Sequence, residues 1–183
     1  MLRNSLTVLA VVICLGCAPI PSSEGESTRT HATIVRTTFL ASDLGPMLAL
    51  YHDILGYELV YSDEYQGTTF RRLFEIDRDA DVDFAILKPP TEDGGSIGIL
   101  VVGDHLEPSI PLAAYAPEFG QAILFSTTGN LNAVYERVRA SDASIVTVVA
   151  PPFATAGGRE MVIADANGIR IYVFEPEAAF RSN

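Results

Sequence analysis

The spacing of apolar residues in the first half of the folded sequence predicts a strand followed by a helix. Residues 33–40 are rich in β-branched side chains, which is typical of a strand. Ser42 and Asp43 can cap a helix, and Gly56 suits the left-handed conformation that ends many helices. Between them, apolar residues recur at the spacing of one helical face; these are Leu44, Met47, Leu48, Tyr51 and Leu55.

Further strands follow this helix, and the second half of the chain repeats the plan. The first half adds strands at 57–62, 82–87 and 97–102, while 68–76 fits either a strand or a short helix. The second half has a strand at 122–127, then a helix that Asn130 can cap, and strands at 144–149, 160–164 and 169–174. The apolar face of this helix is Leu131, Val134, Tyr135 and Val138. Asn167-Gly168 favours a hairpin because both residues accept positive φ. Two runs of strand, helix and three strands indicate an internal duplication.

The N-terminal segment has the pattern of an export signal. Arg3 precedes an apolar run from Leu6 to Leu15, which is too short to span a bilayer comfortably. Cys14-Leu-Gly-Cys17 resembles the lipobox of bacterial lipoproteins, with Cys17 as the lipidated residue and Cys14 where Leu is usual. This resemblance implies an envelope location on the periplasmic side, and Ala18 after the cysteine implies the outer membrane. The alternative is a retained N-terminal anchor helix.

The composition completes the expected organisation. Residues after Cys17 turn to Pro, Ser, Glu, Gly and Thr, as in a flexible tether. The expected boundaries are a signal at 1–17, a tether at 18–31, modules at 32–107 and 120–177 with a linker at 108–119, and a tail at 178–183. The formal net charge of −11 argues against nucleic acid as a partner. Both cysteines lie in the signal, so no thiol chemistry is expected in the folded part.

Two segments resemble the vicinal oxygen chelate superfamily, which contains glyoxalases, bleomycin resistance proteins and dioxygenases. They are Leu50-Tyr-His-Asp-Ile-Leu-Gly-Tyr57 at the end of the first helix and Asp165-Ala-Asn-Gly168 with the following strand. The resemblance covers residues 32–176. It implies an α+β fold in which two βαβββ modules form paired, curled mixed sheets around a cleft. It leaves the reaction open, because this superfamily hosts many chemistries.

The family's metal positions carry unsuitable residues in this chain. Metal enzymes of the superfamily place His or Gln on the first strand of each module and Glu on the last. By the resemblance these positions fall on Arg36 and Gly98 in the first module, and on Gln121 or Ile123 and Tyr172 in the second. Fewer than three protein ligands rarely hold a catalytic ion, so we expect no metal and no cofactor.

The same positions are candidates for binding a ligand. We expect Arg36, Gln121 and Tyr172 to meet a small, partly aromatic ligand with a negative group. Its walls would be strand residues: Phe39, Tyr61, Phe84 and Phe174. Arg36 pairs either with such a ligand or with an internal acid.

Three functions follow from this pattern. The first is a lipid-anchored, metal-free protein that binds or sequesters a small molecule. The second is a lyase, isomerase or ring-cleaving dioxygenase with an altered metal site. The third is an accessory lipoprotein that contacts an envelope partner. The protein could act as a monomer or as a homodimer.

Overall fold

The computed structural model describes residues 34–91, 94–103 and 122–177 of the chain. The predicted signal, tether, linker and tail lie outside these residues, as do Cys17 and Gln121. No helix among the described residues is long and apolar enough to cross a membrane.

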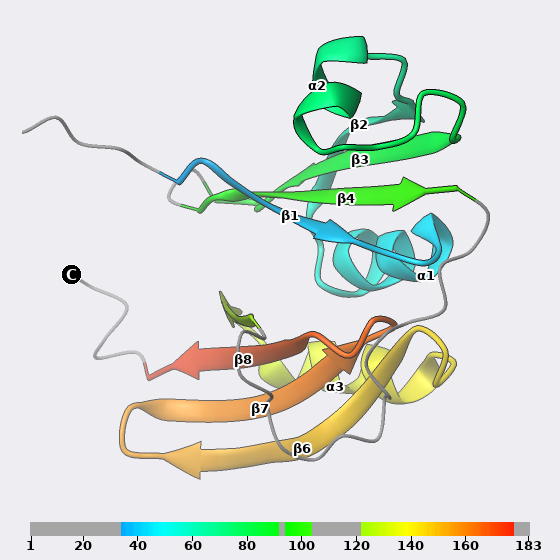
Figure 1. Ribbon diagram of the computed structural model, residues 1–183. Helices are drawn as coiled ribbons and strands as arrows, with labels where there is room; N and C mark the ends of the chain where they lie inside the picture. Colours follow the sequence, from blue (N-terminus) through cyan, green and yellow to red (C-terminus); the bar gives the residue numbers. More distant parts are fainter. Residues whose placement is uncertain (1–33, 92–93, 104–121, 178–183) are drawn as a thin grey trace, which may run out of the picture. The chain divides into compact units, whose positions relative to one another are not determined.

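The first module contains one mixed four-stranded sheet, here sheet A (Figure 1). Its strands are β1 (Arg36–Leu40), β2 (Glu58–Glu64), β3 (Val82–Lys88) and β4 (Ser96–Val102). Their order is β1-β4-β3-β2, with β1 parallel to β4 and the other pairs antiparallel. One continuous helical segment, α1 (Leu44–Leu48) and η1 (Ala49–Ile54), connects β1 to β2. The ambiguous segment is helical, because α2 spans Thr68–Leu73.

The second module repeats this topology in sheet B. Its strands are β5 (Ile123–Thr127), β6 (Val146–Thr155), β7 (Gly158–Asp165) and β8 (Arg170–Pro176), and the helix α3 spans Leu131–Ala140. The order is β5-β8-β7-β6, with β5 parallel to β8. The two runs of elements therefore confirm the predicted fold and its duplication.

The local signals that predicted the helices act as expected. The Asp43 carboxylate accepts a hydrogen bond from the backbone N–H of Gly45 at 2.8 Å. Gly56 follows the first helix with φ of 79°. Asn130 caps α3 by accepting from the backbone N–H of Ala133 at 3.0 Å. Gly168 has φ of 79° in the hairpin between β7 and β8.

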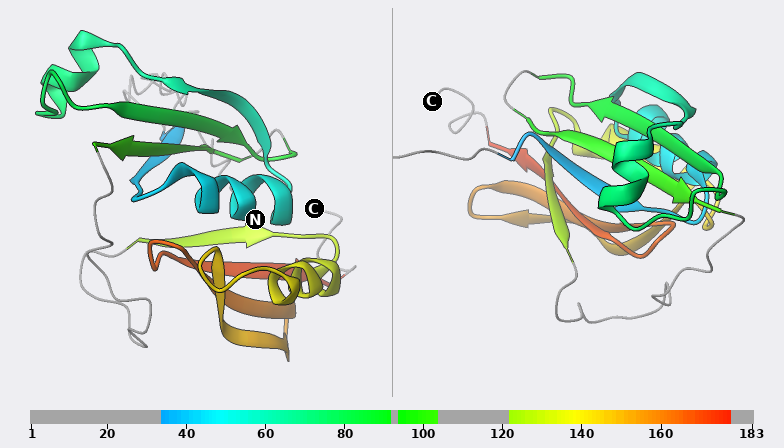
Figure 2. Two further views of the ribbon diagram at one scale, coloured as in Figure 1. Left: turned by 90° about the vertical axis from the view of Figure 1, so that its right-hand side faces the viewer. Right: turned by 45° about the horizontal axis from the view of Figure 1, so that its top comes forward.

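One hydrophobic core joins the two modules. It contains helix residues such as Tyr51 and Val134 together with strand residues of both sheets, such as Ile99 and Ile163. Figures 1 and 2 show α1 between the two sheets. Each sheet therefore has an inner face, which packs into this core, and an outer face turned away from it.

The first helix is apolar over a wider arc than a single stripe. The structure buries Met47 and Tyr51 as predicted, and it also buries Leu50 and Ile54, which the predicted stripe omitted. A helix that contacts its own sheet and the other module must be apolar on both sides. The π-helical turn at Ala49–Ile54 also shifts the side chains around the axis.

A buried hydrogen bond connects this helix to the second module. The Tyr51 hydroxyl donates to Oδ2 of Asp165 at 3.1 Å. The other oxygen of Asp165 accepts from the backbone N–H groups of Asn167 at 3.0 Å and Ile169 at 2.8 Å. One carboxylate thus closes the β7–β8 hairpin and receives the phenol of the first module.

The helix α2 covers part of the outer face of sheet A. Phe70 of α2 packs with Phe84 and Leu100 of that face. The guanidinium of buried Arg71 donates to the backbone carbonyls of Tyr65, Asp77 and Ala80. Arg71 therefore fixes the loops around α2.

Burial raises the pKa of Asp165, although hydrogen bonds from Ile169, Tyr51 and Asn167 oppose part of the rise. The native state then binds more protons than the unfolded state between about pH 3.9 and the higher native pKa. The stability that Asp165 contributes falls as the pH rises through this window. We predict that the free energy of unfolding of the wild type, relative to Asp165→Asn, increases as the pH is lowered through it, measured by urea unfolding.

Asp142→Asn is the matched control. Asp142 is exposed, and the backbone hydrogen bond from Ser144 lowers its pKa. The stability that Asp142 contributes is lost as the pH falls. The free energy of unfolding of the wild type, relative to Asp142→Asn, should therefore decrease as the pH is lowered. The raised pKa of Asp165 would be contradicted if the difference in free energy of unfolding between the wild type and Asp165→Asn stayed constant or decreased as the pH is lowered.

Candidate ligand-binding site

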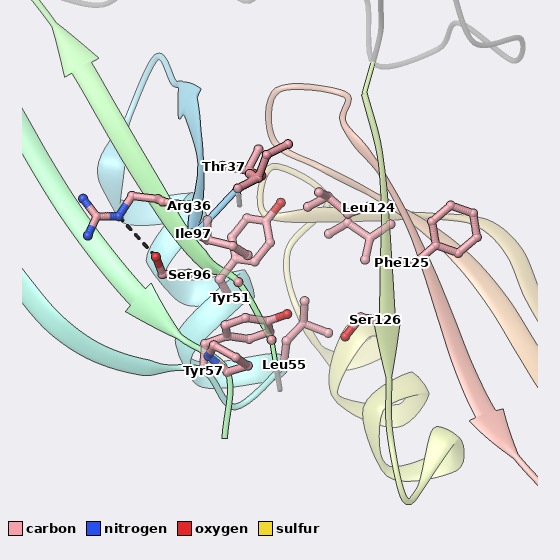
Figure 3. Close-up of a pocket in the computed structure, with 15 residues that line it drawn as sticks. Arg36, Thr37, Tyr51, Leu55, Tyr57, Ser96, Ile97, Leu124, Phe125 and Ser126 are labelled. Carbon is pink, nitrogen blue, oxygen red and sulfur yellow. Dashed lines mark hydrogen bonds between the residues drawn. The ribbon is translucent and has the colours of Figure 1, made fainter. Parts of the chain in front are cut away.

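A small pocket lies where the two modules meet (Figure 3). Its walls come from both modules: Tyr51, Leu55 and Ile97 from the first, and Leu124, Ser126 and Ile171 from the second. Arg36 and Ser96 also line it. Its volume is about 210 Å³, below the roughly 300–1,000 Å³ of pockets for drug-sized ligands. The pocket alone suits only a small fragment, and a larger ligand must extend onto a sheet face.

Arg36 lies at the border between this pocket and the outer face of sheet A. Its Nε donates to Oγ of Ser96 at 3.2 Å, and the Ser96 hydroxyl donates to the carbonyl of Val35 at 3.0 Å. Figure 3 shows the guanidinium turned toward Ser96 and away from Leu124. Its central carbon lies 6.0 Å from the centroid of the Phe84 ring, within range of a cation–π contact.

The two alternatives for Arg36 can be compared with this geometry. Arg36 is exposed, and no carboxylate of the described residues forms an ion pair with it. Asp63 belongs to the same sheet face, where it pairs in register with Phe84. Its strand, β2, is at the opposite edge of the sheet from β1, which carries Arg36. The described part of the chain thus supplies no internal acid for this guanidinium.

Gly98 gives Arg36 the room it occupies. A Cβ at Gly98 would lie 3.2 Å from Cδ of Arg36, 3.2 Å from Cε2 of Phe84 and 2.5 Å from Oγ1 of Thr38. A larger side chain would have to displace these groups. Arg36 and Gly98 thus form one arrangement in which Arg36 occupies space that a side chain at position 98 would need.

The outer face of sheet A brings three of the predicted residues together. The rings of Tyr61 and Phe84 are 6.2 Å apart, and Arg36 lies over Phe84. Phe84 is only 7% exposed because α2 covers it, whereas Tyr61 is 38% exposed. The accessible parts of this group are the Arg36 guanidinium and the Tyr61 phenol, which both pack on the buried Phe84 ring.

Two other predicted residues lie on the outer face of sheet B. Tyr172 and Phe174 alternate there with Ile171 and Val173, which enter the core. The structure does not bring them together with Arg36, and Gln121 lies outside the described residues. The expectation was wrong for Phe39, which is buried in the shared core.

The residues present do not fit the family's divalent metal. At the positions that the resemblance gives to metal ligands, Arg36 adds positive charge, Gly98 has no side chain, and the Tyr172 ring packs at a tilt against that of Phe125, with the centroids 5.1 Å apart. Among the described residues, no group of three or more His, Cys, Asp and Glu side chains could hold an ion. Burial raises the pKa of the Tyr51 phenol well above its ordinary value. Because Tyr51 stays protonated and donates to Asp165, it does not serve as a base.

The sequence analysis missed several residues that shape these surfaces. Ser96 orients Arg36, and its signal was its place at the start of the strand that contains Gly98. Phe125 packs at a tilt against Tyr172 and is exposed; strict alternation along 123–127 would have placed it on the outer face. The Tyr51–Asp165 bond had no local signal, because its partners are 114 residues apart.

The comparisons agree with this fold. The family model described as the glyoxalase/bleomycin resistance protein/dioxygenase superfamily matches residues 33–173. A glyoxalase family protein from Bacillus cereus has a TM-score of 0.64 and 14% identity, over 82% of this chain and 97% of that chain. A glyoxylase/bleomycin resistance protein/dioxygenase domain from Frankia sp. EAN1pec has a TM-score of 0.55 and 14% identity, over 81% and 100%.

A glyoxalase I mutant from Zea mays has a TM-score of 0.52 and 12% identity, over 80% of this chain and 48% of that one. No curated protein matched the chain. These identities establish a shared fold and leave the ligand open. The family match covers most of the chain, and the chain belongs to the glyoxalase/bleomycin resistance protein/dioxygenase superfamily.

Proposed function

We propose that this protein binds a small organic anion with an aromatic part, without a metal, on the outer face of sheet A. The observation that carries the proposal is the exposed guanidinium of Arg36, which has no carboxylate partner among the described residues. A guanidinium can hold a carboxylate or phosphate through two parallel hydrogen bonds. It lies over Phe84, whose ring packs 6.2 Å from that of Tyr61, and these rings supply the apolar contact.

The surroundings support a ligand of this kind. Ser96 accepts from Nε of Arg36, which holds the guanidinium by one of its nitrogens and leaves the two terminal nitrogens for a ligand. A fixed guanidinium loses less conformational freedom on binding than a free one. The pocket beside Arg36 adds room for a small apolar fragment between Tyr51 and Leu124. These features suit binding or sequestration better than catalysis, because the family's metal positions hold Arg36, Gly98 and Tyr172.

The first prediction of this proposal concerns anion binding, with phenylacetate as the probe. Arg36→Ala should weaken phenylacetate binding by roughly tenfold to hundredfold, because a charge-assisted hydrogen bond contributes about 1.5–3 kcal/mol. Isothermal titration calorimetry of the full-length protein measures this change. Benzyl alcohol, which keeps the ring and lacks the charge, should bind weakly to both proteins.

Arg72→Ala is the matched control, because Arg72 is an exposed arginine of α2 in the same module. It removes the same charge from the protein and should leave phenylacetate affinity within about twofold, as expected when surface charges are screened by salt. Equal losses in the two variants would mean that phenylacetate responds only to overall charge, and the Arg36 site would be rejected.

The second prediction concerns metal. Protein purified without added metal should contain less than stoichiometric zinc, nickel, iron and manganese by elemental analysis. Dialysis against EDTA should leave its phenylacetate affinity unchanged, because no step of this binding uses a metal. A stoichiometric ion whose removal abolishes binding would favour the metal-enzyme alternative instead.

We also propose that the domain is held at the envelope by a lipid on Cys17. Support comes from the short apolar run and the Gly16-Cys17 pair, followed by a polar, tether-like segment at 18–31. A single lipid chain binds a membrane only marginally, so stable anchoring needs the several chains of a lipoprotein-type modification. The location proposed is the periplasmic side of the envelope, at the outer membrane.

Cys17→Ser should therefore move the protein from the membrane fraction to the soluble fraction, as followed by fractionation and immunoblotting. Labelling with a palmitate analogue should disappear in the same variant. Cys14→Ser removes the other thiol of the segment and should retain both membrane association and label. If Cys17→Ser stays in the membrane with unchanged mobility, the anchor is the uncleaved N-terminal helix.

A further inference from the structure

The outer face of sheet B forms a second aromatic surface, on a different sheet from Arg36. Phe125 is 77% exposed, and its ring lies 5.1 Å from that of Tyr172 on the neighbouring strand. Figure 3 shows the Phe125 ring on the side of β5 opposite Leu124, and Phe125 also lines the pocket between the modules. Phe153, at the edge of the same sheet, is 44% exposed. The surface is uncommon because large aromatic side chains usually lie inside.

One carboxylate lies among these rings. Glu160 is paired in register with Phe153 on one side and with Phe174 on the other. Directly paired residues of adjacent strands share a face, so the three side chains stand in one row across the sheet. The neighbouring residues Arg159 and Met161 point to the inner face, where Arg159 contacts Asn132 of α3 and Met161 enters the core. Strand alternation therefore places Glu160 on the outer face.

The Glu160 carboxylate is held in place. The Thr155 hydroxyl donates to Oε1 of Glu160 at 2.8 Å. No Arg or Lys of the described residues forms an ion pair with Glu160. Arg170 is the basic residue of β8 on this face, four positions from Phe174, which corresponds to about 13 Å along a strand. The carboxylate of Glu160 and the guanidinium of Arg170 thus belong to different parts of this face.

We propose that the outer face of sheet B binds an organic cation that carries an apolar or aromatic body. The cationic group would lie at Glu160 between Phe153 and Phe174, and the body would lie over Tyr172 and Phe125. Aromatic faces attract cations through the ring quadrupole, and a nearby carboxylate adds a direct charge interaction. The chain's net charge of −11 favours the approach of cations as well.

The charged group of this site would be distinct from that of the anion site, because the two lie on outer faces of different sheets; Phe125 and Arg36 both line the pocket at the junction. Arg36 and the Tyr61–Phe84 pair belong to sheet A, whereas Glu160 and the Phe125–Tyr172 pair belong to sheet B. The proposal can therefore fail while anion binding at Arg36 holds, and the reverse is equally possible.

Benzyltrimethylammonium is the test probe, titrated into the full-length protein by calorimetry or ¹H–¹⁵N NMR. Glu160→Gln keeps the shape of the side chain and removes its charge, and it should weaken binding by at least about tenfold, as expected for a charge-assisted contact. Phe125→Ser alters an exposed residue and should weaken binding by about threefold to thirtyfold. In NMR, the shifted amides should lie on β5, β7 and β8.

Glu136→Gln is the matched control, because Glu136 is an exposed acid on α3 of the same module. It should leave affinity for benzyltrimethylammonium within about twofold, since screening weakens distant surface charges. Equal weakening by Glu136→Gln and Glu160→Gln would overturn the proposal, as would failure of the wild type to bind at millimolar concentration. Self-association that buries Phe125, seen by analytical ultracentrifugation, would assign the face to a second copy and also overturn it.

Discussion

Packing of both modules into one core is the constraint on which the rest of the structure depends. Tyr51 of the first helix reaches the hairpin of the second module and donates to buried Asp165. The apolar residues of both inner faces are used in this core, as Ile99 and Ile163 show. Side chains that could meet a ligand are therefore confined to the outer faces and to the small pocket at the junction.

The duplicated topology gives the two outer faces equivalent positions with different chemistry. On sheet A, α2 covers part of the face, and Arg36 remains exposed with its guanidinium over Phe84. On sheet B, the ring of exposed Phe125 packs at a tilt against that of Tyr172. The charged group among the aromatic residues of this face is Glu160. Duplication thus provides two sheets of the same topology, and the side chains on each outer face determine the charge of that face.

The order of elements could be predicted from the sequence because its signals are local. Asp43 and Gly56 bound the first helix by capping chemistry, and Asn167-Gly168 marks the hairpin before β8. Side-chain alternation along β1 also predicts which residues of that strand face the core. Phe39 is three residues from Arg36, so in a regular strand it must face the opposite side, which is the core.

Other features depend on long-range packing and could not be predicted in this way. Leu50 and Ile54 are buried because the second module covers a side of the helix that one sheet alone would leave exposed. The Tyr51–Asp165 bond needs both modules in place. The crowding of Arg36 against Gly98 follows from the parallel pairing of β1 with β4, which are about 60 residues apart.

A crystal structure of the full-length protein with phenylacetate tests the central claim most directly, because it locates the anion itself. The account predicts the carboxylate at the guanidinium of Arg36, with the ring against Tyr61 on the outer face of sheet A. A carboxylate bound to a metal ion, or located on sheet B away from Arg36, would contradict it.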